Sequence, residues 1–385
     1  MKIFFRYLFI RLLEPFCYCL AGFTLLWVMA DLYGTMEDFL DHKVHFSTVL
    51  WFYALQIPRM LVQVLPAAVL FSTLFTLLAL NRRSELVALQ AGGLAPHWLF
   101  APFLLFGLIC SLVLGYDMSG PAAKSEVARD RILADVKGDS VRANELTNLP
   151  YVDKVNYLVW YFNDLDVSGD TGKARGVQIH QQDAQWHDLD LYVANLARWN
   201  GQFWRLTDVK KISYKENGVV QDQKSYQELD MPDITTPPRE LALIVSQPEQ
   251  LTLGQLAEYI ATSTQTPEYV ARYRTEWWYR IIYPFSVLVL MLYALLQGAR
   301  SDRRSPVAGI GITVVVLIVF TLSINGLFIP AGRYDRLPPF VAVALPEAVF
   351  AAIALHCLAI KNGWYWQVRE WYVKWNADRI ADGKA

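Results

Sequence analysis

An over-long apolar run, VLWFYALQIPRMLVQVLPAAVLFSTLFTLLAL from Val49 to Leu80, is followed directly by the polar stretch NRRSELVALQAGGLAP from Asn81 to Pro96. A transmembrane helix needs about 20 apolar residues to cross about 30 Å of hydrocarbon. The apolar run exceeds that length and carries one charged residue, Arg59. It therefore predicts a membrane span that is interrupted at Pro58-Arg59 and at Pro66, and the change of polarity at Asn81 predicts its end.

The composition of the whole chain agrees with a membrane protein of several spans. Hydrophobic residues make up 54% of the 385 positions and charged residues only 18%, while the net charge of −1 gives no indication of nucleic-acid binding. The first apolar stretch lacks a small-residue cleavage site and is interpreted as a retained helix rather than a signal peptide. Six spans are expected at about 12–30, 49–80, 97–116, 281–296, 307–328 and 339–360.

The short loops between these spans differ in their content of lysine and arginine. Positive residues are enriched on the cytoplasmic side of membrane proteins. One side has three basic residues beside several acids, and the other has eight, namely Lys2, Arg6, Arg82, Arg83, Arg300, Arg303, Arg304 and Lys361. The second side is predicted to be cytoplasmic, which puts both termini inside and the long middle segment outside.

The middle segment, 117–276, has the alternating pattern of β strands. VNYLVWYF from Val155 to Phe162 is apolar on both faces, as in a buried strand. Asn200-Gly201 and Asn217-Gly218 each join two alternating runs, and Asn-Gly is a signal for a type I′ hairpin. We therefore expect an all-β sandwich or open roll. It is followed by a linker-like piece at 233–240 and by a helix over 251–263.

Motifs for catalysis are missing from the sequence. It contains no GxxxxGK[ST] loop for ATP, and no HExxH, CxxC or GxSxG. The four cysteines all fall within predicted spans, and the histidines are scattered. His42 and His45 share a loop with Asp38 and Asp41, but a solvated polar loop explains them better than a metal site. The sequence predicts no enzyme, no cofactor and no metal.

Arg59 is distinguished by its position, because it is a charged residue within a predicted membrane span. About 21 residues separate it from Leu80, or about 31 Å of helix, so it is expected at the outer edge of the hydrocarbon. Two readings are open. The side chain anchors the span by extending to the interface, or its guanidinium holds a phosphate or carboxylate of a lipid head group.

The stretch from Asn81 to Pro96 predicts a short helix with its own start and stop. Ser84 or Asn81 can cap it, and Glu85 suits the positive end of the helix dipole. Gly92-Gly93 provides a C-terminal cap and Pro96 prevents continuation. A simple extension of the preceding span, with Glu85 paired to Arg82, and a helix on which a partner docks are equally compatible with these residues.

Several motifs, in order along nearly the whole chain, resemble the LptF/LptG family of lipopolysaccharide-export permeases. They are FRYLFIRLLEPF, RSELVALQAGG, ANLARWNGQFWRLTDV, LGQLAEYI with YRTEWWYRIIYPFSVLVLMLYAL, and LPPFVAVALPEAVF. The last departs from the family pattern, because Ala344 stands where a tryptophan is often found. RSELVALQAGG and the basic residue in QIPRMLVQVLP are more similar to LptG than to LptF.

The resemblance implies an architecture and a set of site residues. It implies three spans with a coupling helix at 82–91 (1–116), a periplasmic jelly-roll-like β domain (117–276), three further spans (277–360) and a cytoplasmic tail (361–385). Arg59 would correspond to a family lysine near the lipopolysaccharide phosphates, and Lys43 in the first outer loop is the second predicted lipid-binding residue. The coupling helix would meet the ATPase through Arg82, Arg83, Ser84, Glu85, Leu86, Leu89 and Gln90.

The implied function is that of a non-catalytic permease subunit of an ABC transporter in the bacterial inner membrane. Its implied partners are an LptB-like ATPase, an LptF-like permease, LptC- or LptA-like bridge proteins and lipopolysaccharide itself. One alternative is a permease that transmits force to a periplasmic partner without moving lipid. A membrane enzyme would need clustered Asp, His or Cys residues, and a membrane-tethered scaffold would not need a docking helix.

Overall fold

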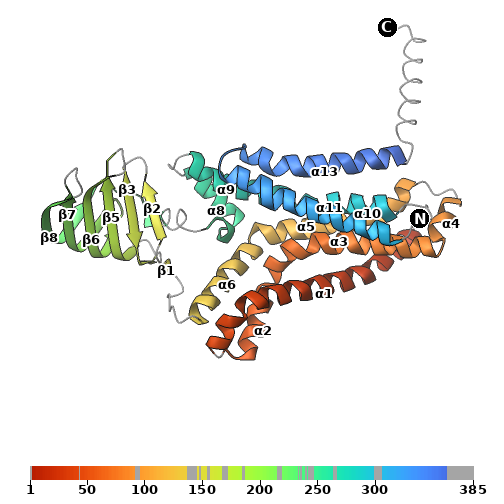
Figure 1. Cartoon of the computed structure of the whole chain (residues 1–385), viewed down its shortest axis with the longest axis horizontal. Helices are drawn as coiled ribbons and strands as arrows, with labels where there is room; N and C mark the ends of the chain where they lie inside the picture. The colour runs from red at the N-terminus through yellow and green to blue at the C-terminus, as the bar shows by residue number, and fades with distance from the viewer. Residues whose placement is uncertain are drawn as a thin grey trace, which may run out of the picture.

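The computed structural model is elongated, with a β sheet at one end and helix α4 near the start of the chain at the other (Figure 1). Membrane-type helices fill the length between them. The structure describes residues 2–361 apart from 43, 92–95, 137–144, 147–148, 154–156, 167–171, 184–186, 215–218, 233, 235, 239–240, 242–246, 263–266 and 299–305. The expected tail from 362 onward therefore lies outside the described residues.

Helices precede and follow the strands in the sequence. Before the sheet they are α1 (Lys2–Asp41), α2 (Phe46–Leu55), α3 (Ile57–Arg82), α4 (Glu85–Ala91), α5 (Pro96–Ser119) and α6 (Pro121–Val136). After it they are η1 (Pro248–Gln250), α8 (Leu253–Thr262), α9 (Pro267–Ile282), η2 (Tyr283–Phe285), α10 (Ser286–Gly298), α11 (Pro306–Thr321), η3 (Leu322–Phe328), α12 (Ile329–Arg333) and α13 (Pro339–Lys361). The helix α8 confirms the one expected over 251–263.

Proline residues set where many of these helices begin. Proline suits the first turn, because its fixed φ is helical and the N–H that it lacks would have no partner there. Within a helix the same missing N–H interrupts the hydrogen bonds, and the π-helical turn η3 lies directly before Pro330 in the fifth span. Among the described residues five α helices start on proline, at Pro96, Pro121, Pro267, Pro306 and Pro339, and the 3₁₀ helix η1 starts on Pro248.

Six helical segments are long and apolar enough to cross a membrane, which confirms the predicted number. The second span differs from the prediction at its start, because it begins at Ile57 and not near Val49. Phe46–Leu55 is a separate helix, Gln56 lies between it and α3, and Pro58 occupies the first turn of α3. Proline at that position cannot donate to the preceding turn, so the over-long apolar run divides into two helices.

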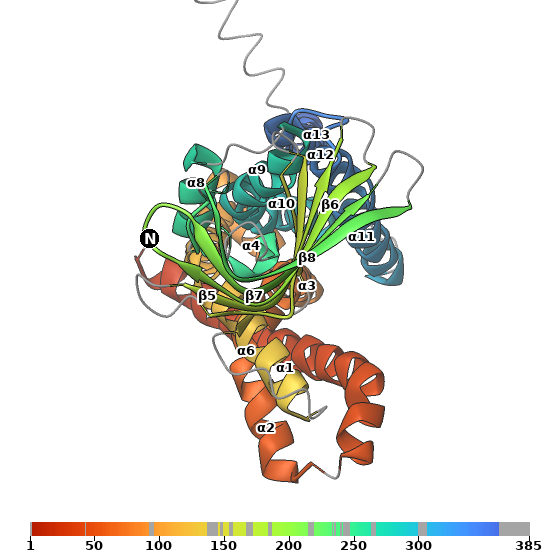
Figure 2. The same cartoon turned by 90° about the vertical axis from the view of Figure 1, so that its left-hand side faces the viewer.

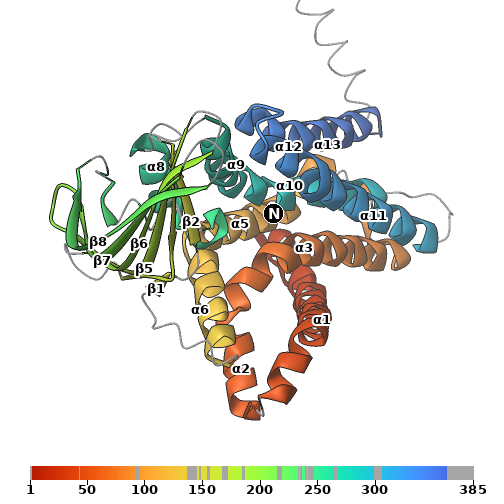
Figure 3. The ribbon, with the colours of Figure 1, turned by 60° about the vertical axis from the view of Figure 1, so that its left-hand side comes forward.

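The membrane part has its densest packing around α3, which contacts α1, α5 and α10. Val69, Leu70, Leu74 and Leu77 of α3 are fully buried in one apolar cluster with side chains of those helices. The first span, by contrast, is mostly exposed. Beyond the buried Leu8 and Leu12 α1 diverges from the bundle, and α2 follows its far end and packs on α6 (Figure 3).

The strands form an all-β domain inserted between α6 and α8, as predicted. The strands are β1 (Glu145–Leu146), β2 (Leu149–Asp153), β3 (Leu158–Phe162), β4 (Asp164–Asp166), β5 (Lys173–Gln182), β6 (Asp188–Trp199), β7 (Trp204–Tyr214) and β8 (Val220–Met231). They lie in one antiparallel sheet whose order is β1-β4-β5-β6-β7-β8, with β3 also on β5 and β2 on β3. The long strands are strongly curved (Figure 2). This single curved sheet corresponds to the open roll and not to a two-sheet sandwich.

One turn of the sheet differs in detail from the prediction. Asn200-Gly201 does join two strands, but Trp199 pairs with Trp204, so four residues form the loop and not two. Only Gly201 of the two has a positive φ, whereas a type I′ turn requires it at both positions. The Asn200 side chain accepts hydrogen bonds from the backbone of Gln202 and Phe203, which stabilises the longer loop. The Asn217-Gly218 hairpin also forms, with its turn outside the described residues.

The expected domain boundary at 117 falls within helix α5. The chain continues from there into α6, which packs on α2, α3 and α5, before the first strand begins at Glu145. Ser125 of α6 donates a hydrogen bond to the carbonyl of Leu55 at 2.8 Å. Helix α6 therefore packs on the membrane helices and also contacts η1, which follows the sheet in the sequence.

The core of the β domain is built around two tryptophans that the linker-like piece helps to cover. Trp160 and Trp204 are almost fully buried, with ring centroids 5.9 Å apart in an edge-to-face arrangement. The Trp204 Nε1 donates to the carbonyl of Thr236 at 2.9 Å, and Ile234 and Leu241 are buried in the same cluster. The described residues Ile234, Thr236 and Leu241 of this piece are thus packed on the sheet.

We predict that Trp204→Ala destabilises the β domain by about 3–5 kcal/mol, the usual cost of removing a large buried aromatic ring. Trp204→Phe keeps a ring in the core and loses the bond to Thr236, so it should cost only about 1–2 kcal/mol. Pulse proteolysis of the full chain in urea, scored on fragments cut between 137 and 250, measures both. Equal stability of the two variants would show that the ring packing contributes little.

Candidate functional site

Helix α4 is separated from α3 by a sharp turn at Arg83 and Ser84. Ser84 has a φ of +58°, in the left-handed region that non-glycine residues seldom adopt. Its N–H bonds to the carbonyl of Asn81, and its own carbonyl accepts from the N–H of Ala88. The chain therefore leaves α3 and starts a new helix at Glu85, so α4 is not an extension of the second span. The predicted Gly92-Gly93 cap lies outside the described residues.

The side chains of this turn point in different directions. Leu86 is buried in the apolar cluster of the membrane helices, whereas Arg82 and Arg83 are exposed. The side chains of Leu89 and Gln90, predicted for the same site, lie outside the described part. Leu86 thus fixes α4 to the bundle while the arginines remain accessible.

Glu85 contacts α1. Its Oε2 accepts a hydrogen bond from the Tyr7 hydroxyl at 2.9 Å, and its Oε1 lies 4.0 Å from Nη1 of Arg83. The sequence offered Arg82 as a partner within the turn, and the observed cation is the next arginine. Glu85 keeps 29% of its side chain exposed. A carboxylate is therefore presented at the end of the bundle that is distant from the sheet.

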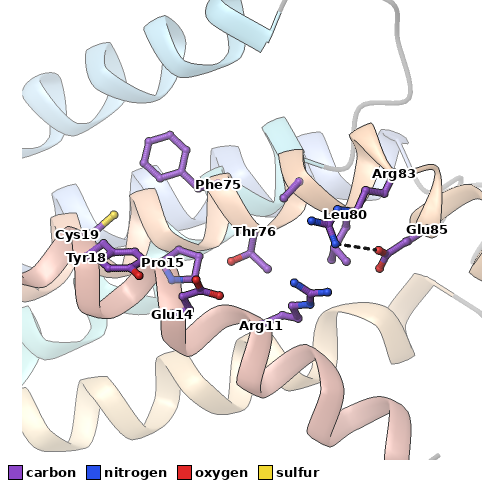
Figure 4. Close-up of a pocket in the computed structure, with 11 residues that line it drawn as sticks. Arg11, Glu14, Pro15, Tyr18, Cys19, Phe75, Thr76, Leu80, Arg83 and Glu85 are labelled. Atoms are coloured by element: carbon purple, nitrogen blue, oxygen red, sulfur yellow. Dashed lines mark ion pairs between the residues drawn. The ribbon is translucent and has the colours of Figure 1, made fainter.

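A cavity of about 550 Å³ opens beside this carboxylate, between α1, α3 and α4 (Figure 4). Charged side chains, including Arg11, Arg83 and Glu85, line the end of the cavity near α4. Apolar side chains line the part nearer the middle of the bundle. Arg11 also places its guanidinium carbon 5.3 Å above the ring of Tyr7. The sequence did not predict this cavity, because its walls come from segments far apart in the chain.

The other predicted site residue, Arg59, lies in the first turn of α3 and pairs with α6. Its Nε is 2.6 Å from Oε2 of Glu126, and its guanidinium carbon is 5.9 Å from the ring centre of Trp27. One of its nitrogens, Nη1, is buried without a hydrogen-bond partner among the described residues. Burial raises the pKa of the Glu126 carboxyl, and the Arg59 guanidinium opposes that rise. The second predicted lipid-binding residue, Lys43, lies outside the described residues.

A third polar group, at the junction of the membrane helices and the β domain, was missed from the sequence. Arg280 of α9 is only 5% exposed and donates to Glu276 Oε1 at 2.9 Å. It also donates to three backbone carbonyls, those of Pro248, Glu249 and Leu251. A guanidinium with this many bonds ties the segment below the sheet to the fourth span.

Arg333 extends this junction to the fifth span. Its Nη2 lies 3.2 Å from Oε2 of Glu276 and 2.8 Å from Oε1 of Glu249. The four-residue spacing of Glu276 and Arg280 was readable in the sequence, but the carbonyl partners come from a distant loop. Among the described residues no three potential metal ligands gather into one group.

Comparison with known proteins identifies the family. The family described as "Lipopolysaccharide export system permease LptF/LptG" matches residues 6–359, which include the six spans and the inserted sheet. The chain belongs to this family. The lipopolysaccharide export system permease protein LptG of Escherichia coli K12 is 23% identical over 322 residues, covering 80% of this chain and 84% of that protein. The LptG of Haemophilus influenzae is 23% identical over 317 residues, covering 81% and 85%.

These relatives agree with the expectation that the chain is more LptG-like than LptF-like. The family membership also confirms the predicted class, that of a membrane-embedded lipopolysaccharide export permease.

We predict that Arg280→Met destabilises the junction by about 3–5 kcal/mol, because it leaves three buried carbonyls and Oε1 of the buried Glu276 without their donor, while Arg333 still pairs with Oε2. Hydrogen–deuterium exchange should speed up in the peptides over 248–260. Arg272→Gln is the matched control, since Arg272 contacts Glu249 at 3.8 Å with 48% of its side chain exposed and should cost no more than about 1 kcal/mol. Similar exchange in both variants would contradict the role of Arg280.

Proposed function

We propose that this permease is the non-catalytic subunit on which a cytoplasmic, LptB-like ABC ATPase docks, with residues 82–91 as the coupling helix. The observation that carries this proposal is the position of α4, a separate short helix at the end of the molecule opposite the β sheet (Figure 1). Its exposed arginines and the partly exposed Glu85 give a partner polar groups to bind. The absence of a P-loop in the sequence agrees with ATP hydrolysis on another chain.

The proposed orientation puts both termini and α4 in the cytoplasm and the β domain in the periplasm of a bacterial inner membrane. The unequal distribution of lysine and arginine between the loops supports it. The cytoplasmic tail over 361–385 belongs to the same proposal, as does the division of the chain into two groups of three spans around the β domain.

The packing offers a mechanical path from α4 to the β domain. Leu86 of α4 is buried in the cluster that also contains side chains of α3 and α10. Helix α10 follows α9 along the chain, and α9 carries Arg280 to the carbonyls below the sheet. Packed interiors transmit displacement because they are dense and resist compression. A push on α4 would thus reach the base of the β domain.

The lipid would be taken from the outer leaflet, at the end of α3 that carries Arg59. The buried Nη1 of Arg59 has an N–H still available, and a guanidinium matches the phosphates of lipopolysaccharide bidentately. The family resemblance implies a lysine at this position, and lysine and arginine bind phosphate differently. Lys43, in the neighbouring loop, is proposed as the second basic contact.

The other proposed partners are a second permease in the membrane and bridge proteins in the periplasm. An LptF-like permease would complete the path for lipid beside the exposed first span. LptC- or LptA-like bridge proteins would extend the β domain by adding strands at an open edge. Strand β8, which ends the sheet and is exposed along most of its length, supplies such an edge. A permease that transmits force without moving lipid remains the alternative, and the lipopolysaccharide-export family does not favour it.

We predict that Glu85→Gln weakens binding of the ATPase by about tenfold or uncouples its hydrolysis from lipid release, since a charged hydrogen bond contributes about 1.5–3 kcal/mol. Tyr7→Phe is the control, because it removes only the contact within the chain. Co-purification and ATPase assays on the assembled complex measure both. If Tyr7→Phe had the same effect as Glu85→Gln, Glu85 would serve α1 and not the ATPase.

We predict that Arg59→Gln lowers photo-crosslinking of lipopolysaccharide, while Glu126→Gln leaves it unchanged or raises it by freeing the guanidinium. A merely structural ion pair would give equal losses for the two variants.

The stability of Arg59→Gln should also depend on pH. Glu126 has a raised pKa in the folded state, so its charged form costs stability above that pKa, and the cost disappears as the pH falls through it. The loss of stability in Arg59→Gln should therefore shrink on acidification. Thermal unfolding at several pH values measures this, and a loss that does not vary with pH would contradict the burial of an unpaired Glu126.

A further inference from the structure

The cavity beside α4 has a polarity gradient along the helix axes. Arg83, Glu85 and Arg11 line its end at the turn between α3 and α4, and Glu14 follows Arg11 on the side of Pro15 and Tyr18 (Figure 4). Apolar and aromatic side chains line the part nearer the middle of the bundle, with Cys19 and Phe75 at its far end (Figure 4). A membrane has the same gradient, from charged head groups to hydrocarbon over a few residues of helix. The cavity is thus oriented as one leaflet is.

The charges at the polar end are balanced, with two guanidinium groups and two carboxylates. Arg83 keeps 61% of its side chain exposed, and its contact with Glu85 is a long one of 4.0 Å. Glu85 accepts a hydrogen bond from Tyr7, whereas the guanidinium of Arg11 lies over the face of the Tyr7 ring and has no ion pair with a described residue. The arginines therefore have N–H groups to offer, and a ligand of zero net charge fits this end.

The volume of about 550 Å³ is within the range of sites that enclose part of a small ligand. The cavity is also far from the proposed lipopolysaccharide contact. Arg59 and Arg83 are at opposite ends of α3, and 24 positions of helix separate them by about 36 Å. A ligand here is therefore distinct from the exported lipid at Arg59.

We propose that this cavity binds a phospholipid with a zwitterionic head group, taken from the leaflet at the α4 end of the bundle. Its phosphate lies between Arg11 and Arg83, which can each form two charged hydrogen bonds to phosphate oxygens. Its ammonium, with three donors, is held by Glu14. An acyl chain extends past Cys19 and Phe75. In the orientation proposed above this leaflet is cytoplasmic, but the site does not depend on the coupling role of α4.

The test uses the full-length permease with its partners in nanodiscs that contain a photoreactive phosphatidylethanolamine with the reactive group in the acyl chain. After illumination, mass spectrometry locates the label. We expect labelled peptides from 11–19 and 75–83 in the wild type. In the double variant Arg11→Gln with Arg83→Gln, the yield of this label should fall about tenfold. Arg82→Gln, the neighbouring arginine that does not line the cavity, should keep it.

A second variant keeps the test decisive if the double variant does not assemble. Ala79→Phe fills the cavity from α3 without changing a charge and should abolish the label. The proposal is overturned if the wild type is unlabelled at these peptides, or if a photoreactive diacylglycerol labels them equally, since the phosphate would then be irrelevant. Equal labelling by a phosphatidylglycerol probe would overturn the zwitterionic assignment. Displacement by millimolar inorganic phosphate would assign the site to a free anion.

Discussion

The buried guanidinium of Arg280 joins the two kinds of structure in this chain. A β domain inserted between membrane helices is connected to them by two chain segments, and such a connection alone would let it rotate freely. Arg280 removes that freedom by binding three carbonyls of the segment 248–251 while it pairs with Glu276 on its own helix. A charge so deeply buried is stable only with its full set of partners. The junction therefore holds one geometry, and the sheet moves with the fourth span.

Helix α3 has the corresponding role within the membrane. Its middle is buried on all sides, and the two arginines at its ends mark the two sites of the molecule, Arg59 near α6 and Arg83 near α4. A helix of fixed length between two sites makes their separation constant. Helix α1 is mostly exposed, but it contacts α3 near both ends of α3. Leu8 and Leu12 of α1 are in the apolar cluster near the C-terminal end of α3, and Trp27 bonds to Gln63 near its N-terminal end. The fixed helix is thus the reference against which the exposed one can move.

Much of this architecture could be predicted because membrane hydrocarbon and β pleating impose simple periods on a sequence. The six spans, the inserted sheet and a separate helix after Arg82 are local patterns, and the structure contains all of them. Pro58 did indicate the break at Gln56, but the residues on both sides of it are equally apolar, and both helices were therefore assigned to one span. The four-residue loop at Asn200 depends on hydrogen bonds from the backbone of Gln202 and Phe203 to the Asn200 side chain, and an Asn-Gly pair alone does not predict these bonds. Arg280 and the cavity could not be predicted, because their partners come from segments that only the fold brings together.

The left-handed backbone of Ser84 gives the joint between α3 and α4 a particular mechanical character. This conformation costs a residue other than glycine about 1–2 kcal/mol, so neighbouring contacts must hold it in place. Leu86 in the apolar cluster and Glu85 on Tyr7 supply that restraint. The backbone strain at Ser84 is therefore balanced by one apolar and one polar contact on the two residues that follow it, which makes the direction of α4 sensitive to changes at Tyr7 or Leu86.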